Sequence, residues 1–153
     1  PKRLLKSWRK EQMAKVEKQP RGLYNMNPGN IEQNRDVFQG EIKPSQDKRF
    51  KQFKSMAYGY RAMFVNLATY NNRGLNTIDT IIRSWAPSVE NHTKEYIECV
   101  EKWSGVDRHK KLTLNSGDDY IEIVAAMSRM ENGIVADMSD VLYGFTLQDR
   151  IKR

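Results

Sequence analysis

The sequence predicts a mainly α-helical protein with one small β-hairpin, an α+β fold. Apolar residues recur at helical spacing along most of the chain after residue 55, which is typical of amphipathic helices on a shared core. The stretch from Gly22 to Phe53 is the exception, because it is rich in Asn, Gly and Pro and holds only short apolar runs. We expect this insert to shape a cleft, since irregular backbone can place polar groups where helices cannot.

Helix ends are marked by turn and capping residues. Asn76 or Thr77 can cap one helix, Pro87 ends it, and Gly105 is a plausible C-terminal cap for the next. Within the insert, Pro28 and Gly29 predict a turn, in which Gly29 can take positive φ. The expected helices cover residues 56–70, 77–86, 93–104, 117–130 and part of 134–153; the expected strand covers 38–42 and its reversal 44–47.

Residues 1–20 are interpreted as a basic helix or arm and residues 21–153 as a single domain. The net charge is +7, which favours binding to polyanions such as nucleic acid, anionic lipid or the acidic polymers of a bacterial envelope. The arm is either a solvated, partly packed helix or a cationic segment that touches an anionic surface. With no secretion signal or membrane span expected, the chain is predicted to stay in a host cytoplasm until release to the envelope, or to be associated with a virion.

Several kinds of chemistry are disfavoured by the residues present. The sequence has no phosphate-binding glycine loop and none of the common zinc-protease or serine-hydrolase motifs. Cys99 falls at an apolar helical position, where a structural thiol is expected. One cysteine with His92 and His109 makes a structural zinc site improbable, so no metal and no cofactor are predicted.

Carboxylates are the remaining candidates for catalysis. Glu131 is expected at a helix C-terminus, where the helix dipole and partial burial would both keep it protonated, as a general acid for glycosidic cleavage requires. Glu41 and Asp47 lie on the two limbs of the hairpin, and either can stabilise an oxocarbenium-like transition state or position water. The alternative for all three is surface charge. Glu90 and Asn91 either line a cleft or serve to begin a helix.

Taken together, the motifs resemble a family of phage and prophage proteins, often labelled structural or virion proteins, that look like lysozyme-like peptidoglycan-degrading domains. The resemblance covers residues 21–133 and rests on the order and spacing of its parts. These are Tyr24-Asn25-Met26-Asn27-Pro28-Gly29-Asn30, Phe38-Gln39-Gly40-Glu41, Asp47, Phe50, Phe53, Gly59-Tyr60-Arg61-Ala62, Gly74-Leu75-Asn76-Thr77-Ile78, Trp85-Ala86-Pro87, Glu90-Asn91, Thr93, Tyr96 and Glu131-Asn132-Gly133.

The resemblance implies cleavage of peptidoglycan glycan strands, by a muramidase or a lytic transglycosylase, as in an endolysin or virion-associated lysin. Glu131, Glu41 and Asp47 are then the catalytic candidates, and substrate binding is expected from Asn25, Asn27, Asn30, Trp85, Glu90, Asn91 and Tyr96. The family often has Gln where this chain has Glu41, and His where it has Met130. Because lysozyme-like domains place the acidic Glu before the hairpin, the order here suggests a circular permutation.

Two other functions compete with this one. A non-catalytic virion component can keep the fold for carbohydrate binding, with peptidoglycan still the expected partner. A nucleic-acid binder is permitted by the charge, but no helix shows a regular Arg/Lys face, so no specific nucleic-acid partner is predicted. The sequence does not indicate an oligomeric state.

Overall fold

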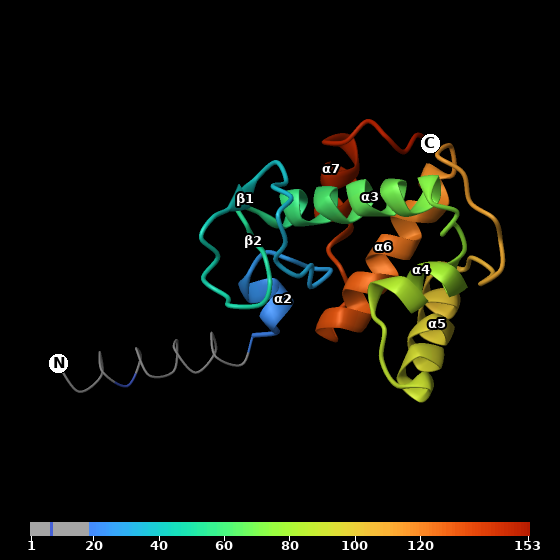
Figure 1. The fold of residues 1–153 in the computed structure, drawn as a ribbon, viewed down its shortest axis with the longest axis horizontal. Helices are drawn as coiled ribbons and strands as arrows, with labels where there is room; N and C mark the ends of the chain where they lie inside the picture. Colours follow the sequence, from blue (N-terminus) through green and yellow to red (C-terminus); the bar gives the residue numbers. More distant parts are fainter. Residues whose placement is uncertain (1–6, 8–18) are drawn as a thin grey trace.

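A computed structural model describes residue 7 and residues 19–153, and its architecture is mainly helical with a two-stranded antiparallel sheet (Figure 1). The predicted α+β class is therefore confirmed. The expected arm at residues 1–20 lies almost wholly outside the described residues. The elements in chain order are α2 (Arg21–Tyr24), β1 (Glu41–Ile42), β2 (Gln52–Phe53), α3 (Met56–Asn72), α4 (Ile78–Trp85), α5 (Glu90–Ser104), α6 (Gly117–Asn132) and α7 (Met138–Thr146).

Helix α3 runs through the middle of the core. It packs against α7, and α5 packs against α6. Phe64 of α3 meets Phe145 of α7 edge to face, with ring centroids 5.2 Å apart. The predicted apolar faces of α3 and α6 are buried, whereas the predicted face of α4 is buried except for Trp85, which is half-buried. The members of the α3 face are Tyr60, Met63, Phe64 and Leu67.

The helix boundaries follow the predicted caps closely. Thr77 and Thr80 bond each other's backbone N–H groups in a capping box at the start of α4. Gly105 ends α5 in the left-handed conformation, with φ 72°. Helix α5 begins at Glu90, earlier than the predicted Thr93, so Asn91 lies within its first turn.

The region before α3 forms a small lobe of loops around the hairpin. Glu41 pairs with Phe53 and Ile42 with Gln52, and an isolated bridge joins Glu32 to Phe50. The strand predicted at 38–42 is shorter than expected, because Gln39 and Gly40 form a turn.

Gly29 does not take the positive φ that such a turn permits. Met26 and Asn30 adopt the left-handed conformation instead, with φ of 52° and 49°. Gly29 is required for space, since a β-carbon there would approach the ring of Trp85 to 2.8 Å and the side chain of Met63 to 2.9 Å.

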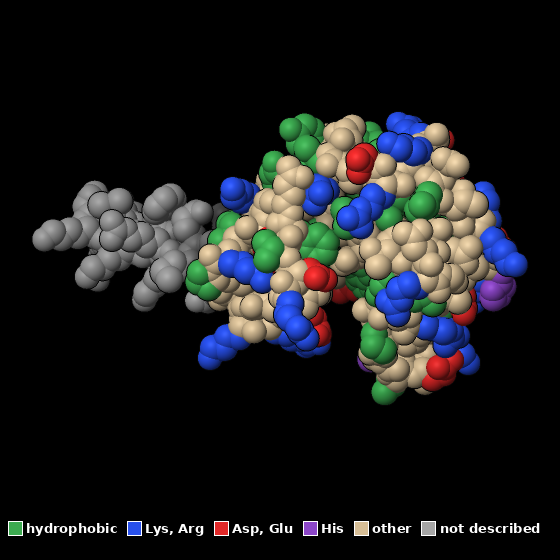
Figure 2. Space-filling view, turned by 45° about the horizontal axis from the view of Figure 1, so that its top comes forward, with side chains coloured by type: hydrophobic (Ala, Val, Ile, Leu, Met, Phe, Trp, Pro, Cys, Tyr) green, Lys and Arg blue, Asp and Glu red, His purple; other side chains and the backbone are tan. Residues whose placement is uncertain are grey.

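The elements are arranged so that the hairpin lobe stands on one side and the α4–α5 pair on the other, with α3 bridging them (Figure 1). Between the two lobes the surface is hollowed (Figure 2). In residues 19–153, none of the helices combines the length and the hydrophobicity needed to span a bilayer.

Candidate functional site between the two lobes

Glu131 lies one residue before the end of α6, at the hollow between the lobes. Gly133 caps this helix with φ 70°, and its N–H donates to the carbonyl of Arg129. The carboxyl group of Glu131 therefore faces the negative end of the helix dipole, which disfavours its ionised form.

Both carboxyl oxygens of Glu131 are held by side chains from other elements. The Nδ2 group of Asn30 donates to Oε1 over 3.0 Å, and the hydroxyl of Tyr96 donates to Oε2 over 2.8 Å. Burial raises the pKa of Glu131 above its usual value, and the bonds from Asn30 and Tyr96 oppose part of that rise. The result is a fixed carboxyl group that favours its protonated form more than a surface glutamate does.

Glu131 lines two adjoining cavities. One, of about 620 Å³, lies between the hairpin lobe and α4, and the other, of about 360 Å³, lies along α5. The size of the first is that of a typical small-molecule site. Ala86, Ser88 and Glu131 belong to the walls of both, so the carboxyl group stands where the two cavities meet.

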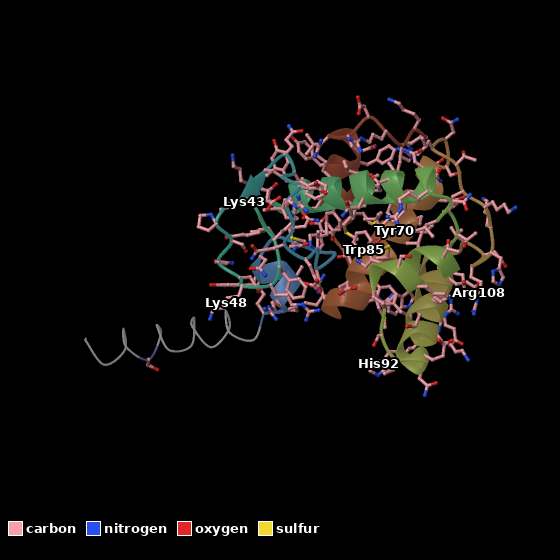
Figure 3. The ribbon with its side chains drawn as sticks, viewed as in Figure 1. Lys43, Lys48, Tyr70, Trp85, His92 and Arg108 are labelled. Atoms are coloured by element: carbon pink, nitrogen blue, oxygen red, sulfur yellow. The ribbon has the colours of Figure 1, made fainter. Side chains whose placement is uncertain are left out.

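Aromatic side chains form one wall of the larger cavity. Trp85 and Tyr70 pack edge to face with their centroids 5.9 Å apart, and Figure 3 shows them together between α3 and α4. The indole N–H of Trp85 donates to the carbonyl of Gly29 over 3.1 Å, which fastens α4 to the hairpin lobe. Phe50 lines the opposite side, with the guanidinium groups of Arg21 and Arg49 over its ring.

The turn over residues 25–30 places the side chain of Asn30 against Glu131. Asn27 is fully buried and bonds the N–H and carbonyl of Ile31 and the carbonyl of Lys51. The Nδ2 group of Asn132 donates to the carbonyl of Pro28 over 3.0 Å, joining this turn to the end of α6. The positive φ of Asn30 then directs its amide at the carboxyl group.

Of the ten predicted site residues, the structure brings four to the cavities. Asn30, Trp85, Tyr96 and Glu131 lie in the walls. Tyr96 is buried and touches the carboxyl of Glu131, and burial together with that carboxyl raises its pKa well above normal.

Glu41 is not brought to Glu131. Its side chain is 1% exposed and is held by the fully buried Lys51, whose Nζ lies 3.1 and 3.2 Å from the two carboxyl oxygens. Lys51 also donates to the carbonyl of Asp36, so this ion pair braces the inside of the hairpin lobe. A carboxylate held in this way has no open side toward the cavities.

Asp47 likewise serves the loops rather than the cavities. It accepts a bidentate bond from Arg21, one bond from Asn25 and the backbone N–H groups of Arg49 and Phe50. The bond from Arg21 is the main reason that the pKa of Asp47 is held far below its usual value. An aspartate so firmly ionised is a structural anchor.

The other predicted binding residues also lie outside the cavity walls. Asn25 is buried and bonds Asp47 and Gln46. Glu90 is exposed and lies 3.5 Å from Arg83, and Asn91 is exposed on α5.

Sequence reasoning missed part of the site. Tyr70, Asn66, Arg49 and Phe50 line the larger cavity. Tyr70 and Asn66 lie four residues apart on α3, and this spacing marks a polar edge beside its apolar face. Asn132 was noted only as part of a helix-ending motif, whereas its amide joins α6 to the loop that carries Asn30.

Over residue 7 and residues 19–153, no cluster of three or more His, Cys, Asp and Glu side chains is placed to hold a metal ion. The site itself offers a half-buried carboxyl group flanked by amide, phenol and indole side chains, a set that suits proton transfer to a bound polar substrate.

These features define a class of small α+β protein with a single held carboxyl group in a cleft between a loop-rich lobe and a helical lobe. No protein-family model matches the chain. It is 37% identical over 124 residues to protein P5 of Pseudoalteromonas phage PM2, an alignment covering 78% of this chain and 76% of the phage protein. The chain belongs to the same family as that phage protein.

Proposed function

We propose that the protein cleaves the glycan strands of bacterial peptidoglycan, with Glu131 as the general acid. The observation that carries the proposal is the state of this carboxyl group: it stands where two cavities meet, both its oxygens are bonded, and burial raises its pKa. A carboxylic acid in such surroundings can protonate a glycosidic oxygen near neutral pH.

In the proposed step, the proton of Glu131 passes to the glycosidic oxygen as the bond from that oxygen to the sugar C1 breaks. The electron-poor C1 is then taken either by water, giving hydrolysis, or by the substrate's own hydroxyl, giving an anhydro sugar. Glu32 and Glu95 are the other described carboxylates in the cavity walls, and Glu32 is paired with Arg49 over 2.7 Å. The geometry leaves both routes open.

The walls of the larger cavity suit a sugar. Trp85 and Tyr70 offer aromatic surface, and Asn34, Asn66, Ser84 and Ser88 offer hydrogen-bonding groups. The net charge of +7 favours approach to anionic envelope polymers. Kinship with a phage protein is consistent with association with a virion, and we propose either that association or release from an infected cell.

Purified peptidoglycan tests the proposal directly. The protein should release soluble fragments and clear the suspension, and Glu131→Gln should lower the rate by at least about 100-fold. Glu98→Gln, an exposed carboxylate on α5 outside both cavities, is the matched control and should keep full activity. Fragment masses then separate anhydro ends from reducing ends. Equal activity of Glu131→Gln and wild type would reject the assignment.

A second candidate is carbohydrate binding without cleavage, favoured by the fact that Glu41 and Asp47, the expected second carboxylates, serve the loops instead. In that case wild type and Glu131→Gln would bind peptidoglycan equally, and neither would release fragments.

A further inference from the structure

Two buried side-chain carbonyl oxygens, one on Asn30 and one on Asn132, lie around the same point beside Gly22. Among the described residues, neither Oδ1 of Asn30 nor Oδ1 of Asn132 has a hydrogen-bond partner. Both lie around the same point, the position that a β-carbon on Gly22 would occupy: Asn30 Oδ1 is 3.0 Å from it and Asn132 Oδ1 is closer still. A buried acceptor without a donor is costly, and two of them facing one point call for a physical explanation.

The amide of Asn30 joins these oxygens to Glu131. Its Nδ2 group donates to Oε1 of Glu131, while its oxygen faces the region of Asn132. This orientation suits an ionised Glu131, whose oxygens only accept. Rotating the Asn30 amide by half a turn about its Cβ–Cγ bond exchanges Oδ1 and Nδ2, two groups of nearly equal size. This rotation needs no repacking and leaves the positive φ of the Asn30 backbone unchanged.

Glu131, Asn30, Asn132 and Tyr96 form one cluster, in which Asn30 and Tyr96 bond Glu131 directly. After the half turn of the Asn30 amide, a protonated Glu131 supplies the donor that Oδ1 of Asn30 lacks. The proton on Oε1 of Glu131 is donated to Oδ1 of Asn30, and Nδ2 of Asn30 is directed toward Oδ1 of Asn132. Tyr96 still donates to Oε2, and Asn132 still donates to the carbonyls of Pro28 and Ser128. Oδ1 of Asn30 then has a donor, and the turned Nδ2 group lies with Oδ1 of Asn132 around the same point beside Gly22.

We propose that Asn30 and Asn132 are positioning residues that hold the proton of Glu131: the Asn30 amide turns with the protonation state, accepting from the acid and donating to the carboxylate. The proposal rests on Glu131 being the general acid. When Glu131 gives its proton to the substrate, the amide turns back and Nδ2 stabilises the new carboxylate. The side chain of Asn132 makes no hydrogen bond to the carboxyl group of Glu131, so it acts through Asn30.

Other charged groups around the cluster are few. Glu32 and Arg49 face Glu131 across the larger cavity as an ion pair, and His92 and Glu95 of α5 line the smaller one. None of them bonds Glu131 or either asparagine in the described structure. We therefore expect a change in the protonation of Glu131 to alter the hydrogen bonds of Asn30 and Asn132 before those of any other side chain.

NMR titration of the wild-type protein, with labelled Glu and Asn side-chain carbons, tests the proposal without requiring activity. The Asn132 Cγ signal should shift with the same midpoint as the Glu131 Cδ signal, because Oδ1 of Asn132 gains a donor only when Glu131 is protonated. In Glu131→Gln this shift should vanish. An Asn132 signal that stays flat across the Glu131 titration would overturn the proposal.

A variant pair gives an independent measurement. Asn132→Ala removes the acceptor for the turned amide and should lower the Glu131 pKa by about 0.5–1 unit. Asn71→Ala, which also removes two hydrogen bonds but lies at the far end of α3, should leave that pKa unchanged. Equal pKa values in Asn132→Ala and wild type would reduce Asn132 to a structural role. If the coupled NMR shifts and the pKa change in Asn132→Ala are observed but the protein does not cleave peptidoglycan, only the proposed function is refuted.

Discussion

The hydroxyl of Tyr96 donates to Oε2 of Glu131 over 2.8 Å, linking the middle of α5 to the end of α6. Tyr96 was predicted to bind substrate, but its ring is buried and its hydroxyl is bonded to this carboxyl group. If Glu131 is the acid, as proposed, this bond fixes the orientation of its carboxyl group in advance, which is the form of preorganisation that proton transfer requires.

Tyr96→Phe should move the pH profile of cleavage upward. The hydroxyl stabilises the carboxylate and so opposes the rise in the pKa of Glu131; without it, burial acts with less opposition. Because the general acid must be protonated, the alkaline limb of kcat/KM should shift by about 0.5–1 unit to higher pH.

The control for this variant is Tyr120→Phe. Tyr120 is also buried and its hydroxyl accepts a 2.8 Å bond from Asn71, but it lies in the core away from Glu131. It should lose stability without moving the pH profile. A Tyr96→Phe enzyme with an unshifted alkaline limb would show that the phenol does not tune the acid.

Glu131→Gln should stabilise the fold above weakly acidic pH. The folded pKa of Glu131 is raised, so the unfolded chain releases this proton first and stability falls as pH rises from the unfolded pKa to the folded one. Gln is neutral at every pH and escapes this loss. Thermal unfolding should therefore give a higher Tm for the variant at pH 7 and a nearly equal Tm at pH 4. A lower Tm at pH 7 would mean that the ionised carboxylate is well stabilised by its surroundings.

The helices could be predicted from sequence because their signals are local. Apolar spacing and capping residues such as Thr77 and Gly105 act within a few positions of the chain, and each of the predicted helices over residues 56–146 is present within a few residues of its expected bounds. The identity of Glu131 as the residue at a helix end followed from the same local pattern, since Gly133 terminates α6.

The partners of the loop residues could not be predicted in the same way. Whether Asn25, Asn27 or Asn30 faces a ligand depends on which distant group each one meets, and these groups lie 22, 24 and 101 positions away. Similarly, nothing next to Glu41 in the sequence shows that Lys51 lies buried against it. Polar residues in an irregular insert are needed to satisfy buried backbone, and only the fold separates those from the ones that face a cavity.

Lys51→Met should destabilise the protein strongly. It leaves the carboxylate of Glu41 buried without its cation, and breaking a buried pair from one side typically costs about 3–5 kcal/mol. The double variant Lys51→Met, Glu41→Leu should recover most of that free energy of unfolding, as measured by urea denaturation. If Glu41→Leu alone kept its stability but lost cleavage, Glu41 would regain a direct role in the chemistry.

Trp85→Ala should weaken substrate binding more than it slows the chemical step. The indole forms a wall of the larger cavity and packs on Tyr70, while Glu131 is held by residues that do not include it. On soluble glycan fragments, KM should rise between about 2-fold and 10-fold with kcat changed less. Trp103→Ala is the matched control, because Trp103 is also half-buried, near the end of α5, and packs under Arg129 of α6 outside both cavities. A fall in kcat with KM unchanged would place Trp85 in the support of Glu131, through its bond to Gly29, and not in the sugar-binding wall.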